Sequence, residues 1–87
     1  MTDRDRQTLH QLFLVGLRRS GERGFTAFVL AQHARAELGL ELTEERATAE
    51  LRQLADRKFV APLQNLLTGT RWIITDTGEQ ALASAGL

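Results

Sequence analysis

The sequence predicts a single α+β domain in which helices dominate: three helices, a β-hairpin and a fourth helix, together spanning residues 1–87. Three observations lead to this prediction. Apolar residues recur at helical spacing in three successive stretches of the chain. Two short stretches rich in β-branched and aromatic residues then follow, separated by a polar loop. At 87 residues the chain is long enough for one modest hydrophobic core and too short for two.

The first predicted helix runs from about Thr2 to Arg19. One of its faces carries four apolar or small residues: Leu9, Leu12, Phe13 and Gly16. Three further apolar residues lie off that face: Leu14, Val15 and Leu17. Two explanations remain open. Either later elements cover both sides of the helix, or the helix forms the seam of a homodimer, with Leu14 and Leu17 in the contact surface.

The second predicted helix runs from Phe25 to Leu38. Thr26 is the expected N-cap, and Gly39 is placed to end the helix in a left-handed conformation. Its candidate buried residues are Phe28, Leu30, Ala31, Ala34 and Leu38.

The third predicted helix occupies the stretch from Leu42 to Val60 and is expected to begin after Thr43, whose hydroxyl is a good N-cap. Glu44 and Glu45 favour the positive end of this helix. Its inner face is expected to hold Ala47, Leu51, Leu54 and Ala55. Its outer face is expected to hold Glu45, Arg46, Ala49, Arg52, Gln53 and Asp56.

A hairpin and a last helix complete the prediction. The strands are expected at Phe59 to Leu63 and at Arg71 to Thr75, joined by a loop from Gln64 to Thr70. Pro62 requires an edge or bulge position because it has no N–H to donate. Thr75 or Asp76 then caps a helix that extends to about Ala85.

Composition excludes several classes of protein. There are no cysteines, so disulfides and thiolate metal sites are excluded, and the N-terminus does not resemble a signal peptide. The longest apolar run is far too short to span a bilayer, and we expect a cytoplasmic protein without contact to a membrane. His10 and His33 are the only histidines, and no nucleophile lies in a recognisable motif. We therefore expect no enzymatic activity, metal or cofactor.

The runs ELRQLADRKFV and RWIITDTGEQAL, which flank the hairpin, resemble the pattern of winged helix-turn-helix proteins. Together with GFTAFVLAQHARAELGL, they make the chain similar to small winged-helix proteins encoded in Mu-like prophages, over about Gly24 to Leu82. This resemblance implies a DNA-binding transcriptional regulator of bacterial or phage type. It places the third helix in the major groove of double-stranded DNA and the hairpin along the backbone.

The same resemblance implies which residues contact DNA. Thr43, Arg46, Ala49 and Arg52 are expected to face the groove, where either arginine reads guanine, and Arg71 is expected to contact phosphate. The charges leave a second interpretation open. Eleven acidic residues balance eleven basic ones, whereas DNA-binding domains usually carry a basic excess. The spacing also predicts that Arg46 pairs with Glu50 and Arg52 with Asp56, which leaves solvated structural charges as an alternative.

The alternative function is a protein-interaction or dimerisation module that does not bind DNA. Leu66 and Leu67 lie at the expected tip of the hairpin. If both are exposed, two adjacent leucines form a contact surface for a protein partner or a second copy of the chain. If one of them folds back onto the core, that surface is lost.

Overall fold

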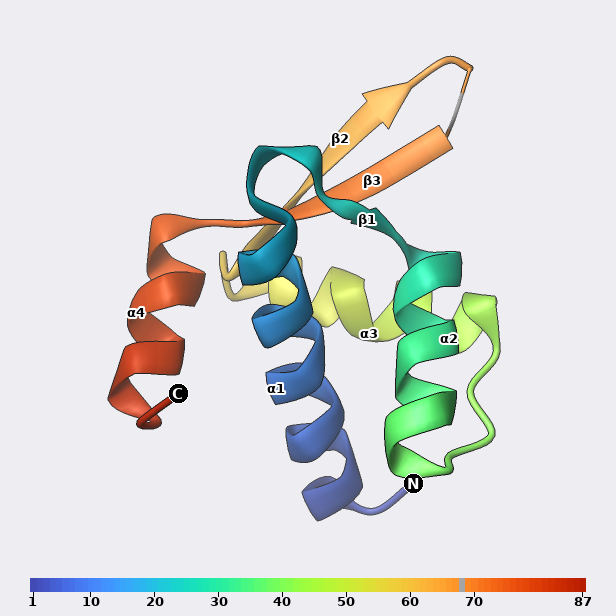
Figure 1. The fold of residues 1–87 in the computed structure, drawn as a ribbon, viewed down its shortest axis with the longest axis vertical. Helices are drawn as coiled ribbons and strands as arrows, with labels where there is room; N and C mark the ends of the chain where they lie inside the picture. The colour runs from blue at the N-terminus through green and yellow to red at the C-terminus, as the bar shows by residue number, and fades with distance from the viewer. Residues whose placement is uncertain (68) are drawn as a thin grey trace.

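Within residues 1–67 and 69–87, which the computed structural model describes, four α-helices pack with a three-stranded antiparallel sheet (Figure 1). The elements follow one another in the order α1 (Asp3–Ser20), the 3-10 turn η1 (Gly21–Arg23), β1 (Phe25–Thr26), α2 (Ala27–Leu38), α3 (Glu44–Asp56), β2 (Val60–Asn65), β3 (Gly69–Ile74) and α4 (Asp76–Ser84). The predicted α+β class is confirmed. None of the helices in this part of the chain is both long and apolar enough to cross a membrane.

The predicted helix ends are largely confirmed. A threonine hydroxyl accepts a hydrogen bond from the backbone N–H three residues on at the start of all four described helices: Thr2 for α1, Thr26 for α2, Thr43 for α3 and Thr75 for α4. The donor–acceptor distances are 3.1, 3.3, 3.1 and 3.1 Å. Gly39 follows α2 with a φ of +65°, in the left-handed region. The alternative cap Asp76 is instead the first residue of α4.

One strand was not predicted. Phe25 and Thr26, expected to begin the second helix, form the short strand β1, which pairs with β3 at Trp72 and Arg71. Gly24 allows this approach, since it has a φ of +68° and an added Cβ would lie 2.3 Å from the carbonyl oxygen of Trp72. The pairing partner of β1 lies far along the chain, so local periodicity carries no signal for it.

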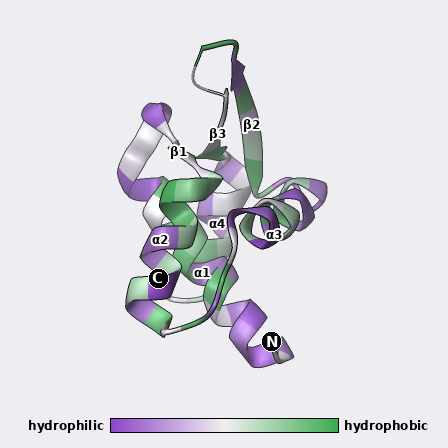
Figure 2. Ribbon diagram, turned by 90° about the vertical axis from the view of Figure 1, so that its right-hand side faces the viewer, coloured by the Kyte–Doolittle hydropathy of each residue, from purple (hydrophilic) through white to green (hydrophobic). Residues whose placement is uncertain are grey.

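The hairpin formed by β2 and β3 is longer than predicted and protrudes from the helices (Figure 2). Its paired register runs from Val60 opposite Ile74 to Asn65 opposite Gly69. Most of the loop predicted from Gln64 to Thr70 is therefore strand, and position 68 lies outside the described residues. The sheet order is β1-β3-β2, which gives Pro62 the edge strand that it requires.

The core is built around α1, which contacts the other three helices and β3. Leu14 and Leu17, expected as a contact surface for a partner, are buried inside this core. That prediction is wrong because later elements cover both sides of α1, the explanation that the sequence had left open. Phe28, expected to be buried, is half exposed near the start of α2. Trp72 and Leu82 close the core from β3 and α4.

Candidate functional site

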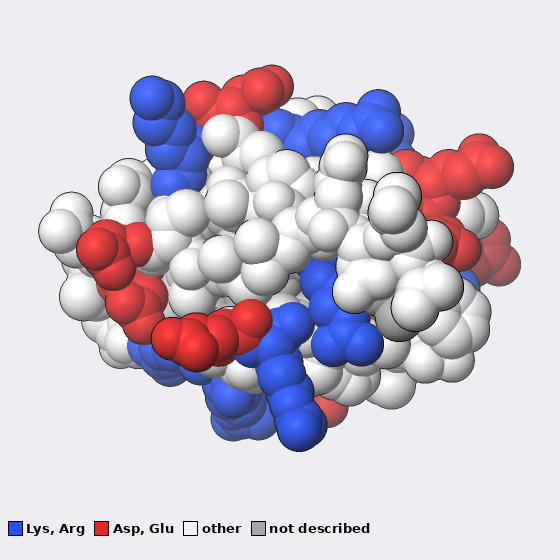
Figure 3. Space-filling view, turned by 90° about the horizontal axis from the view of Figure 1, so that it is seen from above, with Lys and Arg blue, Asp and Glu red and all other residues white. Residues whose placement is uncertain are grey.

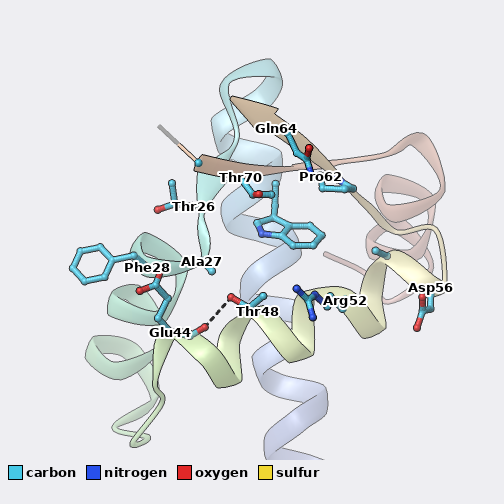
Figure 4. Close-up of a pocket in the computed structure, with 13 residues that line it drawn as sticks. Thr26, Ala27, Phe28, Glu44, Thr48, Arg52, Asp56, Pro62, Gln64 and Thr70 are labelled. Atoms are coloured by element: carbon cyan, nitrogen blue, oxygen red, sulfur yellow. Dashed lines mark hydrogen bonds between the residues drawn. The ribbon is translucent and has the colours of Figure 1, made fainter. Parts of the chain in front are cut away.

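A groove separates the exposed face of α3 from the hairpin (Figure 4). Its volume is about 780 Å³. The residues that line it come from the start of α2, from α3 and from both hairpin strands: Thr26, Ala27, Phe28, Glu44, Thr48, Arg52, Ala55, Asp56, Pro62, Gln64, Gly69, Thr70 and Trp72. The groove is therefore formed by segments that are far apart in the sequence.

The lining of this groove combines apolar and polar side chains, with one cation and two anions. Hydroxyls of Thr48 and Thr70 and the amide of Gln64 supply neutral hydrogen-bonding groups. The Thr48 hydroxyl is already engaged, since it donates to the backbone oxygen of Glu44 at 2.9 Å. Among the described residues of the groove Arg52 is the one cation, and Glu44 and Asp56 are the anions. The groove thus offers few positive charges to a phosphate backbone.

Arg52 nevertheless has no partner among the residues that the structure describes. The ion pair that the sequence predicts between Arg52 and Asp56 is not formed, and the arginine makes no hydrogen bond there. Its side chain is exposed on α3 and borders the groove (Figure 4). All of its hydrogen-bonding capacity is therefore available to an incoming acceptor.

Arg46 behaves differently. Its Nε lies 3.3 Å from Oε2 of Glu50, as the helical spacing predicts. Glu50, however, is fully buried, not part of the outer face of α3. Arg46 is therefore held against the α1 side of the helix, and part of its charge is neutralised there.

Glu50 is the centre of a buried charge cluster that links α1 to α3. Arg6 Nε lies 3.0 Å and His10 Nε2 lies 2.9 Å from its Oε1. The Arg6 and Arg46 contacts are ion pairs without an aligned hydrogen bond from Nε, whereas His10 makes a hydrogen bond. The sequence contained a signal for this cluster, because Ala47, Glu50 and Leu54 follow helical spacing along one face.

The other predicted DNA contacts are only partly brought together. Ala49 and Arg52 lie on the same exposed face of α3. Thr43 is exposed at the start of that helix, where its hydroxyl serves as the cap. Arg71 lies on the opposite face of the sheet, because side chains alternate along a strand and its neighbours Thr70 and Trp72 face the groove. The structure therefore separates Arg71 from α3.

The tip of the hairpin is apolar. Leu66 and Leu67 have relative exposures of 105% and 95%, so neither folds back onto the core. Leu63 on β2 is also exposed. We call these three residues the hairpin-tip leucines. Of the two outcomes that the sequence had left open for Leu66 and Leu67, the structure shows exposure.

Charged side chains of both signs surround this end of the molecule (Figure 3). They alternate around an uncharged region and form no continuous basic surface in that view. The formal net charge of zero agrees with this distribution. Any binding of a polyanion here must therefore depend on a few specific contacts.

No metal centre is evident in residues 1–67 and 69–87, where no three side chains of the metal-binding types cluster. The ring of His33 packs edge-on against Phe25, with the ring centroids 5.6 Å apart. Comparison of the chain with models of known protein families and with curated proteins finds no match.

Proposed function

We propose that the chain is a winged helix-turn-helix domain that binds double-stranded DNA through the exposed face of α3 and the adjacent hairpin. Three features support the proposal: the short connection between α2 and α3, the uncovered outer face of α3, and a protruding hairpin beside it. In this fold α3 enters the major groove and the hairpin follows the backbone. The sequence resemblance to the winged-helix pattern of small bacterial regulators favours a role in transcriptional regulation.

The observation that carries this proposal is the unpaired guanidinium of Arg52 on the uncovered face of α3. Arginine donates two parallel hydrogen bonds to O6 and N7 of guanine, and no internal carboxylate competes for Arg52 in the structure. Ala49, one turn earlier on the same face, is small enough to let the helix approach base edges. Arg46 is a weaker candidate because Glu50 already holds it.

The charge distribution sets the expected strength of binding. Glu44 and Glu45 lie in the first turn of α3 and repel phosphates. Affinity for random duplex is therefore expected to be low and to fall with salt, and most of the binding energy comes from a few contacts.

The test is fluorescence anisotropy of a labelled duplex library, with Arg52→Ala compared with Arg4→Ala. Both variants remove one exposed arginine, but Arg4 lies at the far end of α1 from the hairpin (Figure 1). Losing a bidentate base contact of about 1–3 kcal/mol predicts that Arg52→Ala weakens binding to a selected site by roughly 5- to 150-fold. Arg4→Ala is expected to change it little. Equal effects of the two variants contradict the assignment of α3.

A second candidate function is protein–protein contact through the hairpin-tip leucines, favoured by their exposure. With Leu14 and Leu17 buried, this tip replaces α1 as the candidate dimer surface. Sedimentation velocity of wild type and of the double variant Leu66→Ser, Leu67→Ser tests whether the hairpin tips form a dimer contact. Concentration-dependent association that the double variant abolishes supports a homodimer, and a monomer at every concentration excludes one.

A further inference from the structure

A second hollow lies on another side of α3, between α1, the end of α3 and α4. Its volume is about 400 Å³, within the range of small-molecule sites in proteins. It shares no lining residue with the groove that faces the hairpin. A ligand bound in this cleft would therefore not occupy the surface proposed for DNA.

The cleft has an apolar floor. Leu14, Leu54 and Leu82 are buried at its base, and the ring of Phe59 is half-buried beside them. Ala81 on α4 also lines the cleft, with a small apolar side chain. Such a surface favours a hydrocarbon body over a fully hydrated ion.

The rim of the cleft is basic. Arg6 and His10 from α1 and Arg57 at the end of α3 all line it, and the acidic residue that lines it is Asp3. The glutamines at positions 7, 11 and 53 add neutral hydrogen-bonding groups. A ligand that satisfies both rim and floor combines an anionic head with an apolar body.

The two arginines of the rim differ in their partners. Arg6 is paired with the buried Glu50, whose Oε1 lies 3.0 Å from the Arg6 Nε. The guanidinium of Arg57 lies over the ring of Phe59, 4.9 Å from its centroid, and forms no ion pair with any described residue. Guanidinium groups bind carboxylates through paired hydrogen bonds.

We propose that the cleft between α1, α3 and α4 is a binding site for a small amphipathic carboxylate, with the head group at Arg57 and the hydrocarbon body over Phe59, Leu82 and Ala81. The proposal is independent of DNA binding, since the cleft and the α3 groove are separate.

The experiment titrates the full chain with octanoate, octan-1-ol and octylammonium, following backbone amide shifts by ¹⁵N–¹H correlation spectra. Octanoate is expected to bind most tightly and to shift amides of α1, the end of α3 and α4. Octan-1-ol is expected to bind more weakly at the same residues, and octylammonium most weakly of the three. Equal affinities for octanoate and octan-1-ol overturn the proposal, as does the absence of octanoate binding.

Variants test separately the contacts of the ligand's head group and those of its hydrocarbon body. Arg57→Gln is expected to weaken octanoate binding about tenfold or more, the effect of losing a hydrogen bond between charged groups, and to leave octan-1-ol unchanged. Gln53→Glu, at an exposed position of the rim, is also expected to weaken octanoate binding, because the new carboxylate repels the carboxylate of the ligand. Ala85→Phe, which fills the cleft from α4, is expected to weaken binding of both probes.

Arg52→Gln is the matched control for Arg57→Gln, since it removes the same charge from the side of α3 that faces the hairpin. It is expected to leave octanoate affinity unchanged. If Arg57→Gln and Gln53→Glu both retain wild-type affinity for octanoate, the head group does not bind at this rim and the proposal is wrong.

Discussion

Replacement of the buried Glu50 by glutamine probes the charge cluster that joins α1 to α3. The carboxylate is fully buried, whereas the side chains of Arg6 and Arg46 are 37% and 46% exposed. Glu50→Gln keeps the shape of the side chain and one acceptor oxygen. If that oxygen stays with Arg6 and His10, the new amide nitrogen meets Arg46, a donor facing a donor.

The expected cost follows from these exposures. Removing one partner of a fully buried ion pair costs about 3–5 kcal/mol, because the other charge is left without compensation. Here both arginines can turn toward water, so neither is left buried without a partner. The expected loss of unfolding free energy is therefore about 1.5–3 kcal/mol, the contribution of a hydrogen bond to a charged group. For a domain of this size that corresponds to a decrease in Tm of roughly 6–24 °C.

Urea denaturation followed by circular dichroism measures this effect. The midpoint is expected to fall while the slope m stays the same, which assigns the change to stability. Glu37→Gln, at an exposed position of α2, is the control and is expected to change the free energy of unfolding by less than about 0.5 kcal/mol. The difference in the free energy of unfolding between wild type and Glu50→Gln is expected to persist at about 1 M salt, where exposed ion pairs are screened. Equal stabilities of Glu50→Gln and wild type refute a buried, charged Glu50.

Two glycines in helices are expected to respond to alanine with opposite signs, measured by the same denaturation. Gly16→Ala is expected to stabilise by roughly 0.5–1 kcal/mol, because its Cβ would make an ordinary 3.7 Å contact and alanine favours helix. Gly78→Ala is expected to destabilise by about 1–3 kcal/mol despite the same propensity, because its Cβ would lie 2.2 Å from the Phe59 carbonyl oxygen; a stabilised variant contradicts this packing. Thr75→Val is expected to cost about 1–2 kcal/mol, since it removes the α4 cap and the hydroxyl donor to the Lys58 carbonyl; unchanged thermal unfolding argues against that role.

Local chemistry made much of the fold predictable. Thr26, Thr43 and Gly39 act on groups within a few residues, so their roles are visible in the sequence. The strand at Phe25 is different, because its hydrogen bonds go to Trp72 and no neighbouring residue indicates them. The burial of Leu14 likewise depends on the packing of several elements around α1.

The candidate site was harder to predict for the same physical reason. Helical geometry placed Arg52 and Ala49 on the exposed face of α3 correctly. It also predicted the contact between Arg46 and Glu50, but not the burial of Glu50, because that burial depends on α1, which brings Arg6 and His10 to the same carboxylate. The position of Arg71 depends on the sheet register, in which a shift of one residue reverses the face.

Binding of duplex DNA across a salt series tests the central proposal most directly. Wild type is expected to bind at low salt with an affinity that falls as salt rises, with a shallow slope because the face carries few cations. Arg52→Ala is expected to weaken that binding, and Arg4→Ala to leave it nearly unchanged. An absence of duplex binding at low salt, or an affinity that does not depend on salt, contradicts DNA recognition by α3.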